Sequence, residues 1–149
     1  MLAYLFGHPG DSVVAAALEK AAASSSKALI AAPNWAEICY QVERKIGPRR
    51  WASTREKLLA LPIEIVPADQ SFAEAAGAIK ASKKMSLADC FAAALTARVK
   101  GELLTGDPEF REVEESIKIV WLGKKPVAGG WLSRSRVRAP KYTHVKRLV

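Results

Sequence analysis

The sequence predicts an α/β protein: a three-layer α/β/α sandwich built on a short parallel sheet. Apolar residues alternate along the chain between stretches with helical spacing and short runs with strand spacing. Helical stretches separate the short runs, which favours parallel strands joined by right-handed crossovers. The chain has 149 residues and half of them are apolar, so one domain can bury a sizeable core.

Four short runs have the length and composition of strands. The first, "KALIA", is compact and apolar, and the second, "IEIV", alternates like a strand. The third, "ELL", is very short, and "IKIVWL" is the last run before the composition changes. We therefore predict strands at Lys27–Ala31, Ile63–Val66, Glu102–Leu104 and Ile117–Leu122.

The helical stretches begin and end at recognisable local signals. Asp11 follows a break rich in glycine and is the expected N-cap of the first helix. Pro33 and Asn34 open the second helix, and a Gly-Pro pair ends it. The predicted helices run from Asp11 to about Ala23, Trp35 to about Lys45, Trp51 to about Leu61, Ser71 to Ala81 and Ser86 to Lys100.

Charge divides the chain into two parts. Residues 1–122 contain 15 Lys/Arg and 15 Asp/Glu, whereas residues 123–149 contain 8 Lys/Arg and no acid. The formal net charge of +8 therefore lies in the C-terminal stretch, which also has no helical or strand period. We expect a domain over residues 1–122 and a basic, flexible extension over residues 123–149. Binding of RNA phosphates by this extension is the less favoured alternative.

The two cysteines and the hydropathy pattern indicate the compartment. Cys39 and Cys90 lie in apolar helical stretches without metal-ligand spacing, so we interpret them as small buried hydrophobic residues in a reducing environment. The chain also lacks the run of about 18 apolar residues that a membrane span needs. A cytoplasmic protein is the expectation.

Three acids stand near the starts of predicted helices or helical turns. Glu37 follows Asn34 by three residues, Asp89 follows Ser86 by three residues, and Asp107 directly precedes a Pro-Glu pair. One interpretation is purely local, because both spacings match a capping box and Asp-Pro-Glu commonly opens a helix. The other is that these acids share a site, because the carboxyl ends of parallel strands form the ligand crevice of open α/β sheets.

Convergence of three acids would require a cation. Two carboxylates about 4 Å apart repel by about 4 kcal/mol at an effective dielectric of 20, whereas a helix N-terminus returns only about 0.3 to 1 kcal/mol. No His or Cys stands near these acids in sequence except Cys39 and Cys90, already assigned to the core. Oxygen ligands select Mg²⁺ or Mn²⁺, and such an ion can activate water for attack on a phosphodiester.

The motifs around these acids resemble a known family. "SLADCFAAAL" followed by "ELLTGDPEF", with "APNWAEICYQVERK" upstream, is similar to the PIN domain and closely similar to its VapC-type toxins. The T-G-D-P-E-F segment, at the expected distance after S-L-A-D, is the most specific part. The resemblance covers residues 1–122.

The resemblance implies a Rossmann-like sandwich that cleaves RNA as the toxin of a type II toxin–antitoxin pair. Glu37, Asp89 and Asp107 would hold Mg²⁺ or Mn²⁺ and act in catalysis. Thr105 resembles the hydroxyl residue that positions a water or a phosphate. Glu109 would be an additional acid in the outer coordination sphere of the ion. A cognate antitoxin, an RNA substrate and a homodimer are the partners that it implies.

One part of the family pattern differs here. The family begins with a strand that ends in an aspartate, followed by a short apolar helix, whereas this sequence opens inside that helix with "MLAYL". We expect either that the natural protein carries the strand upstream of Met1 or that the chain is a decayed copy. The second case leaves an alternative function, a truncated and catalytically impaired PIN fold that captures an antitoxin. A third is an unrelated α/β protein whose acids are only caps.

Overall fold

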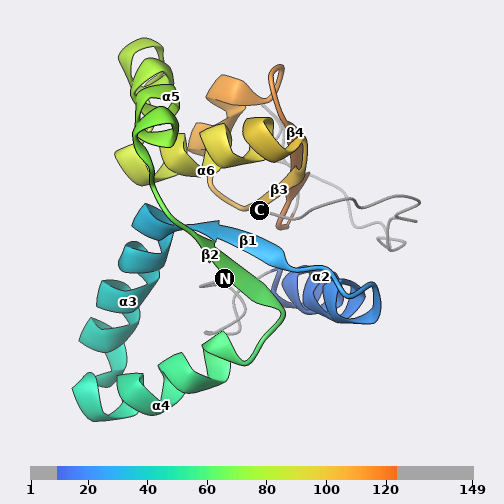
Figure 1. Cartoon of the computed structure of the whole chain (residues 1–149), viewed down its shortest axis with the longest axis vertical. Coiled ribbons are helices and arrows are strands. Elements are labelled where there is room, and N and C mark those ends of the chain that lie inside the picture. The colour runs from blue at the N-terminus through green and yellow to red at the C-terminus, as the bar shows by residue number, and fades with distance from the viewer. Residues whose placement is uncertain (1–9, 124–149) are drawn as a thin grey trace, which may run out of the picture.

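The structure is a computed structural model, and it describes residues 10–123. Helices and strands alternate along this part of the chain, as the apolar spacing predicts (Figure 1). In order, the elements are α2 (Asp11–Ala23), β1 (Ala28–Ala31), α3 (Ala32–Ile46), α4 (Pro48–Leu59), β2 (Ile63–Val66), α5 (Gln70–Ser82), α6 (Leu87–Val99), β3 (Glu102–Thr105), the 3₁₀ helix η1 (Pro108–Val113) and β4 (Lys118–Trp121).

Two pairs of parallel strands form the middle layer. β1 pairs with β2, with Ala28 opposite Ile63, and β3 pairs with β4, with Glu102 opposite Lys118. Within the described residues no ladder joins one pair to the other. In Figure 1, β1 lies between β2 and the β3–β4 pair.

Helices cover both faces of these strands, which confirms the predicted three-layer fold. Successive residues of a strand point to opposite faces. Leu103 packs in a cluster with α5 and α6, whereas Leu104 packs against a cluster that contains Val14 and Leu18 of α2. The α/β/α sandwich therefore follows directly from the alternation of apolar residues in β3.

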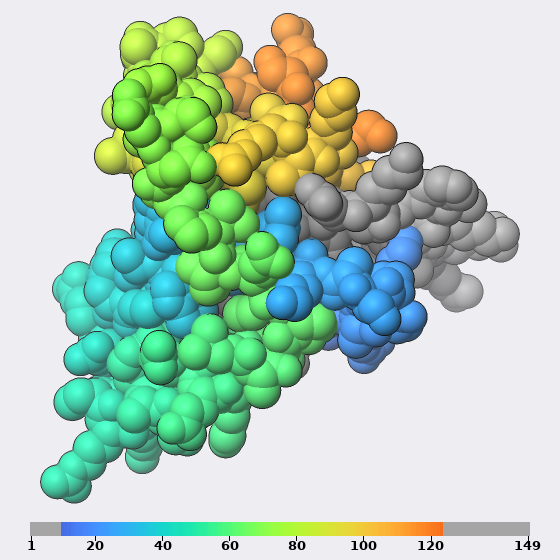
Figure 2. Space-filling view, in the orientation of Figure 1, coloured from blue at the N-terminus to red at the C-terminus, as the bar shows by residue number. Residues whose placement is uncertain are grey.

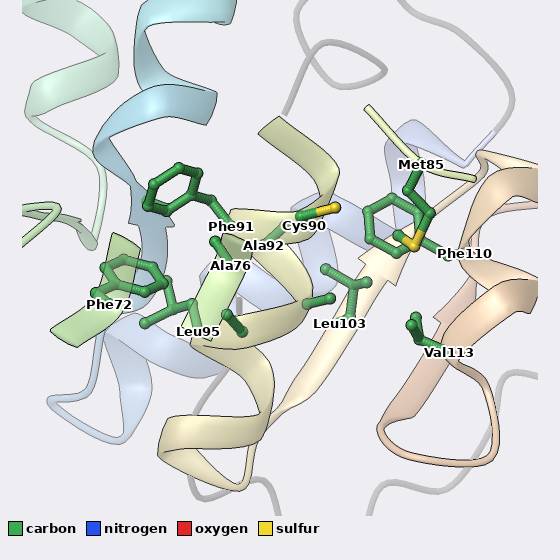
Figure 3. Packing of buried hydrophobic residues seen from close by; sticks show 13 residues of the cluster. Phe72, Ala76, Met85, Cys90, Phe91, Ala92, Leu95, Leu103, Phe110 and Val113 are labelled. Atoms are coloured by element: carbon green, nitrogen blue, oxygen red, sulfur yellow. The ribbon is translucent and has the colours of Figure 1, made fainter. Parts of the chain in front are cut away.

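The largest cluster is centred on α6. Every residue from Cys90 to Thr96 is buried, and the Thr96 hydroxyl is satisfied by donating to the Ala92 carbonyl at 2.8 Å. Phe72 of α5 meets Phe91 edge-on, with ring centroids 5.0 Å apart, and Figure 3 shows this pair within the cluster. α6 is apolar around most of its circumference, as expected for a helix that is surrounded by other elements.

The α3–α4 hairpin forms a second, smaller cluster. Val42 and Leu58 are almost fully buried between the two helices, and Trp35 packs against Trp51 with centroids 6.2 Å apart. Figure 2 shows the α3–α4 hairpin projecting at the opposite end of this face from α5 and α6. Cys39 of this hairpin is only partly buried, whereas Cys90 is buried as predicted.

Two predicted helix caps are wrong for local reasons. α3 begins at Ala32, three residues early, because Pro33 fits the first turn of a helix, and Asn34 is therefore not its cap. Asp11 is the first residue of α2 rather than its cap, since Gly10 takes the cap position in a left-handed conformation. The remaining boundaries fall within three residues of prediction. No helix within residues 10–123 is long and apolar enough to cross a membrane.

Candidate active site

The candidate site is a pocket between β1 and β3, with a volume of about 550 Å³. Its walls come from the last three residues of each strand and from the first two turns of α3 and α6. Most of the lining is apolar. Among residues 10–123, the only charged residues that line it are Glu37, Asp89 and Asp107. The three acids therefore converge on one crevice at the carboxyl ends of the strands.

Glu37 does not belong to a capping box. Ala31 occupies the N-cap position of α3, and no side chain makes a capping hydrogen bond there. The Glu37 carboxylate instead lies one and a half turns into α3, where its Oε1 accepts hydrogen bonds from Gln41 Nε2 at 2.9 Å and from the Tyr40 hydroxyl at 3.4 Å. Its position facing the pocket is thus not explained by helix capping.

Asn34 joins the two helices that carry Glu37 and Asp89. Its Nδ2 donates to the Ala88 carbonyl at 2.9 Å, across 54 residues of sequence. This bond fixes the first turn of α3 against the first turn of α6. The Asn34 Oδ1 also lies in a buried position, and no hydrogen-bond partner for it is found in residues 10–123. The sequence did not predict this contact between the helices, because an Asn in this position was interpreted as a helix cap.

Ser86 caps the helix that carries Asp89, as predicted, but Asp89 does not complete a capping box. Ser86 is the N-cap of α6, and its Oγ accepts from the Asp89 N–H at 3.1 Å and donates to Asp89 Oδ2 at 2.7 Å. Burial raises the pKa of Asp89, the Ser86 hydrogen bond partly offsets this, and the charges of Asp107, Glu109 and Glu37 raise it further. The acids are therefore close enough to oppose ionisation of Asp89.

Asp107 and Thr105 form the turn after β3. Asp107 Oδ1 accepts from the Glu109 N–H at 2.9 Å, so Asp107 caps η1 as predicted. Thr105 is buried, and its Oγ1 accepts from the Asp107 N–H at 3.1 Å. Because that oxygen acts here as an acceptor, the hydroxyl proton of Thr105 is available to a group in the pocket.

Glu109 lies outside the pocket but supports it. Its Oε2 accepts from the backbone N–H of Ser86 at 3.2 Å. In a standard capping box, the acid three residues after the cap accepts from that N–H. Glu109 takes this position here, which leaves Asp89 Oδ1 without a capping role and ties η1 to the start of α6.

The donor set suits a hard cation, although the arrangement is not compact. Among residues 10–123, no three His, Cys, Asp or Glu side chains lie close enough together to hold an ion as they stand. The pocket does contain three carboxylates and the unpaired amide oxygen of Asn34, all of them oxygen ligands. Oxygen-only sites suit Mg²⁺ and Mn²⁺, which bind through a few carboxylates and complete their shell with water.

Comparison with known proteins gives one result. The model of the PIN domain family matches residues 1–116, which is more than half of the chain. No curated protein and no solved structure matches.

Proposed function

The chain belongs to the PIN domain family, whose members are in general metal-dependent nucleases, and from this premise we propose that it is an Mg²⁺- or Mn²⁺-dependent endoribonuclease. We further propose that it is the toxin of a type II toxin–antitoxin pair that acts in the cytoplasm as a homodimer. The close similarity of the segments around Asp89 and Asp107 to VapC-type toxins supports this finer assignment.

One observation carries the nuclease proposal. Carboxylates from α3, from α6 and from the turn after β3 line the same pocket, and no basic residue in the described part of the chain lines it with them. A bound divalent ion supplies a Lewis acid and an activated water. Glu37, Asp89 and Asp107 would hold that ion at the carboxyl ends of the strands.

The remaining residues of the site position these groups. Asn34 holds α3 against α6, and Glu109 holds η1 against α6, so the spacing of the three acids depends on both contacts. Thr105 offers its hydroxyl proton to a phosphate oxygen or a water beside Asp107. The attack itself would be an in-line displacement on an RNA phosphodiester.

The test is RNA cleavage by the purified chain 1–149 with Mn²⁺ or Mg²⁺. Asp89→Asn should lower the cleavage rate at least about 100-fold, because loss of an ion ligand removes several kcal/mol of transition-state stabilisation. Glu43→Gln is the matched control, since Glu43 lies exposed on the same helix as Glu37 but outside the pocket. Cleavage that persists in EDTA would contradict the proposal.

A second function is supported by the separation of the strand pairs. β1 and β3 are not joined within the described part of the chain, and the acids do not form a compact cluster there. These two facts favour a catalytically impaired PIN fold that captures an antitoxin. It predicts weak Mn²⁺ binding by calorimetry and no RNA cleavage, with partner binding retained. Robust cleavage by the chain 1–149 would eliminate it.

A further inference from the structure

We propose that one face of α3, formed by Tyr40 and Arg44, binds the single-stranded RNA next to the phosphate that is cleaved. A base of the RNA stacks on the Tyr40 ring, and Arg44 binds a phosphate further along the strand. This inference rests on the proposed nuclease function, because it names the path that the substrate takes away from the acids. It concerns binding, however, and can be tested without cleavage.

Tyr40 is an aromatic residue at the surface beside the acids. It is 49% exposed, whereas every other aromatic residue of the described chain is buried or partly buried. Its hydroxyl donates to Glu37 Oε1 at 3.4 Å, so the side chain lies next to one of the three acids of the site. Unpaired bases stack on exposed aromatic rings of this kind, largely independently of sequence. The Tyr40 ring therefore offers a stacking surface to a base that flanks the pocket.

Arg44 continues the same face of α3 away from the pocket. At 3.6 residues per turn, Glu37, Tyr40 and Arg44 lie within about 60° of one another around the helix, and Arg44 is about 10 Å further along the axis than Glu37. The face that carries Val42 packs against α4 instead. Figure 1 shows α3 leading from the end of β1 toward α4. An RNA strand that passes Glu37 and Tyr40 along this helix reaches Arg44 next.

The charge of this region favours a polyanion. Residues 43–57, from the end of α3 through most of α4, contain six Lys/Arg and two Asp/Glu, whereas the rest of residues 10–123 contains nine Lys/Arg and thirteen Asp/Glu. Arg44 is exposed and forms no salt bridge within the described chain. Basic side chains that neutralise phosphates supply most of the sequence-independent affinity for nucleic acids. An acidic protein segment would match this charge too, but it has no base to stack on Tyr40.

The experiment measures binding of a labelled single-stranded RNA of about 12 nucleotides to the chain 1–149 by fluorescence anisotropy. EDTA is present, so that no metal-dependent cleavage occurs. Tyr40→Leu should raise the Kd at least about fivefold, the lower end of the loss expected for one base stack. Tyr40→Phe is the matched control, since it keeps the ring and loses only the hydroxyl, and its Kd should equal that of the wild type. An oligonucleotide without bases should bind the wild type and Tyr40→Leu equally.

The salt dependence of the same binding tests Arg44. Arg44→Gln should reduce the slope of log Kd against log salt concentration by about 0.7, the value for one phosphate contact with a single strand. Lys27→Gln is the control, because Lys27 is exposed and directly precedes β1, at the opposite end of this strand from the acids. Its slope should equal that of the wild type.

Five results would overturn the proposal. The first is an unchanged Kd in Tyr40→Leu, and the second is an unchanged slope in Arg44→Gln. The third is an equal loss in Tyr40→Phe and Tyr40→Leu, which would assign the effect to the hydrogen bond with Glu37. The fourth is an equal loss for the oligonucleotide without bases. The fifth is weaker binding of polyglutamate, but not of RNA, in both variants, which would assign the face to an acidic protein.

Failure of the proposed nuclease function gives a different result. In that case the wild type binds RNA in EDTA and Tyr40→Leu binds it more weakly, but neither protein cleaves RNA when Mn²⁺ is added. This outcome would support the RNA-binding face of α3 and contradict the nuclease proposal.

Discussion

The surroundings of Asp89 oppose its ionisation. Its side chain is partly buried at the start of α6 and faces Asp107, Glu109 and Glu37. Burial is the largest cause of its raised pKa, and the three charges add to it. A carboxylate that is ionised under these conditions destabilises the fold, which is common where a site is arranged for binding rather than for stability.

The raised pKa predicts the pH dependence of stability for Asp89→Asn without metal. Below the ordinary value of 3.8, Asp89 is protonated in both the folded and the unfolded chain and contributes no difference. As the pH rises through the raised pKa of the folded state, the unfolded chain releases its proton first and the wild type loses stability. Asp89→Asn should therefore be more stable than the wild type at pH 7, and the two should converge near pH 3.

Denaturant unfolding in EDTA over this pH range measures the effect. Glu43→Gln should follow the wild-type curve, because Glu43 is exposed and does not line the pocket. A wild type that is the more stable protein at pH 7 would show that the Ser86 hydrogen bond outweighs burial and repulsion.

Contacts between elements set the geometry of the site. α3 and α6 are held by the Asn34 bond, and η1 is held to α6 by Glu109. The start of α2 is fixed differently, by close packing of Gly10 against Leu122 at the end of β4. Leu122 also lines the pocket, so this contact connects the first described helix to the site.

Gly10→Ala should destabilise the fold. Gly10 has a φ of +99°, and an added Cβ would lie 2.7 Å from the Cβ of Leu122. A conformation that side chains rarely adopt, together with this overlap, should cost about 1 to 3 kcal/mol. Thermal unfolding measures the change.

Gly77→Ala is the matched control for this substitution. Gly77 lies in the interior of α5, and an added Cβ there meets nothing within 4 Å. The change should stabilise the chain by about 0.5 to 1 kcal/mol, because Ala restricts the unfolded backbone and favours the helix. An equal effect of the two substitutions would contradict the close approach of Gly10 to Leu122.

At the scale of the whole molecule, the net charge of the sequence is positive, whereas the charged residues of the pocket are acidic. Residues 1–122 are neutral overall, the pocket is acidic, and the excess positive charge lies in the C-terminal part of the sequence. An acidic pocket in a neutral domain attracts a small cation more readily than a polyanion. The proposed ion therefore has a second role, since it would reduce the repulsion between the pocket and RNA phosphates.

Divalent ions should stabilise the folded chain. If one Mn²⁺ binds only the folded state, a concentration 100 times the Kd adds about 2.7 kcal/mol. Asp107→Asn should remove most of this gain while keeping the cap of η1, because Asn is as good an N-cap as Asp. Glu43→Gln should keep the full gain.

Thermal unfolding with and without Mn²⁺, and again after EDTA, measures this stabilisation. A gain that is the same in Asp107→Asn and in the wild type would place the ion elsewhere. No gain in any protein would favour the impaired binding module.

The sequence by itself determined the alternation of helices and strands, the α/β/α class and the caps at Ser86 and Asp107, because periodicity and capping act over a few residues. It also placed Glu37, Asp89 and Asp107 near one sheet edge, since the ends of parallel strands meet there. Only the tertiary structure decided that Asn34 bonds to Ala88 rather than capping a helix, that Glu109 replaces Asp89 at the Ser86 N–H, and that a pocket lies between β1 and β3. The two hydrogen bonds join residues 54 and 23 positions apart, and no local pattern encodes which distant groups come to lie side by side.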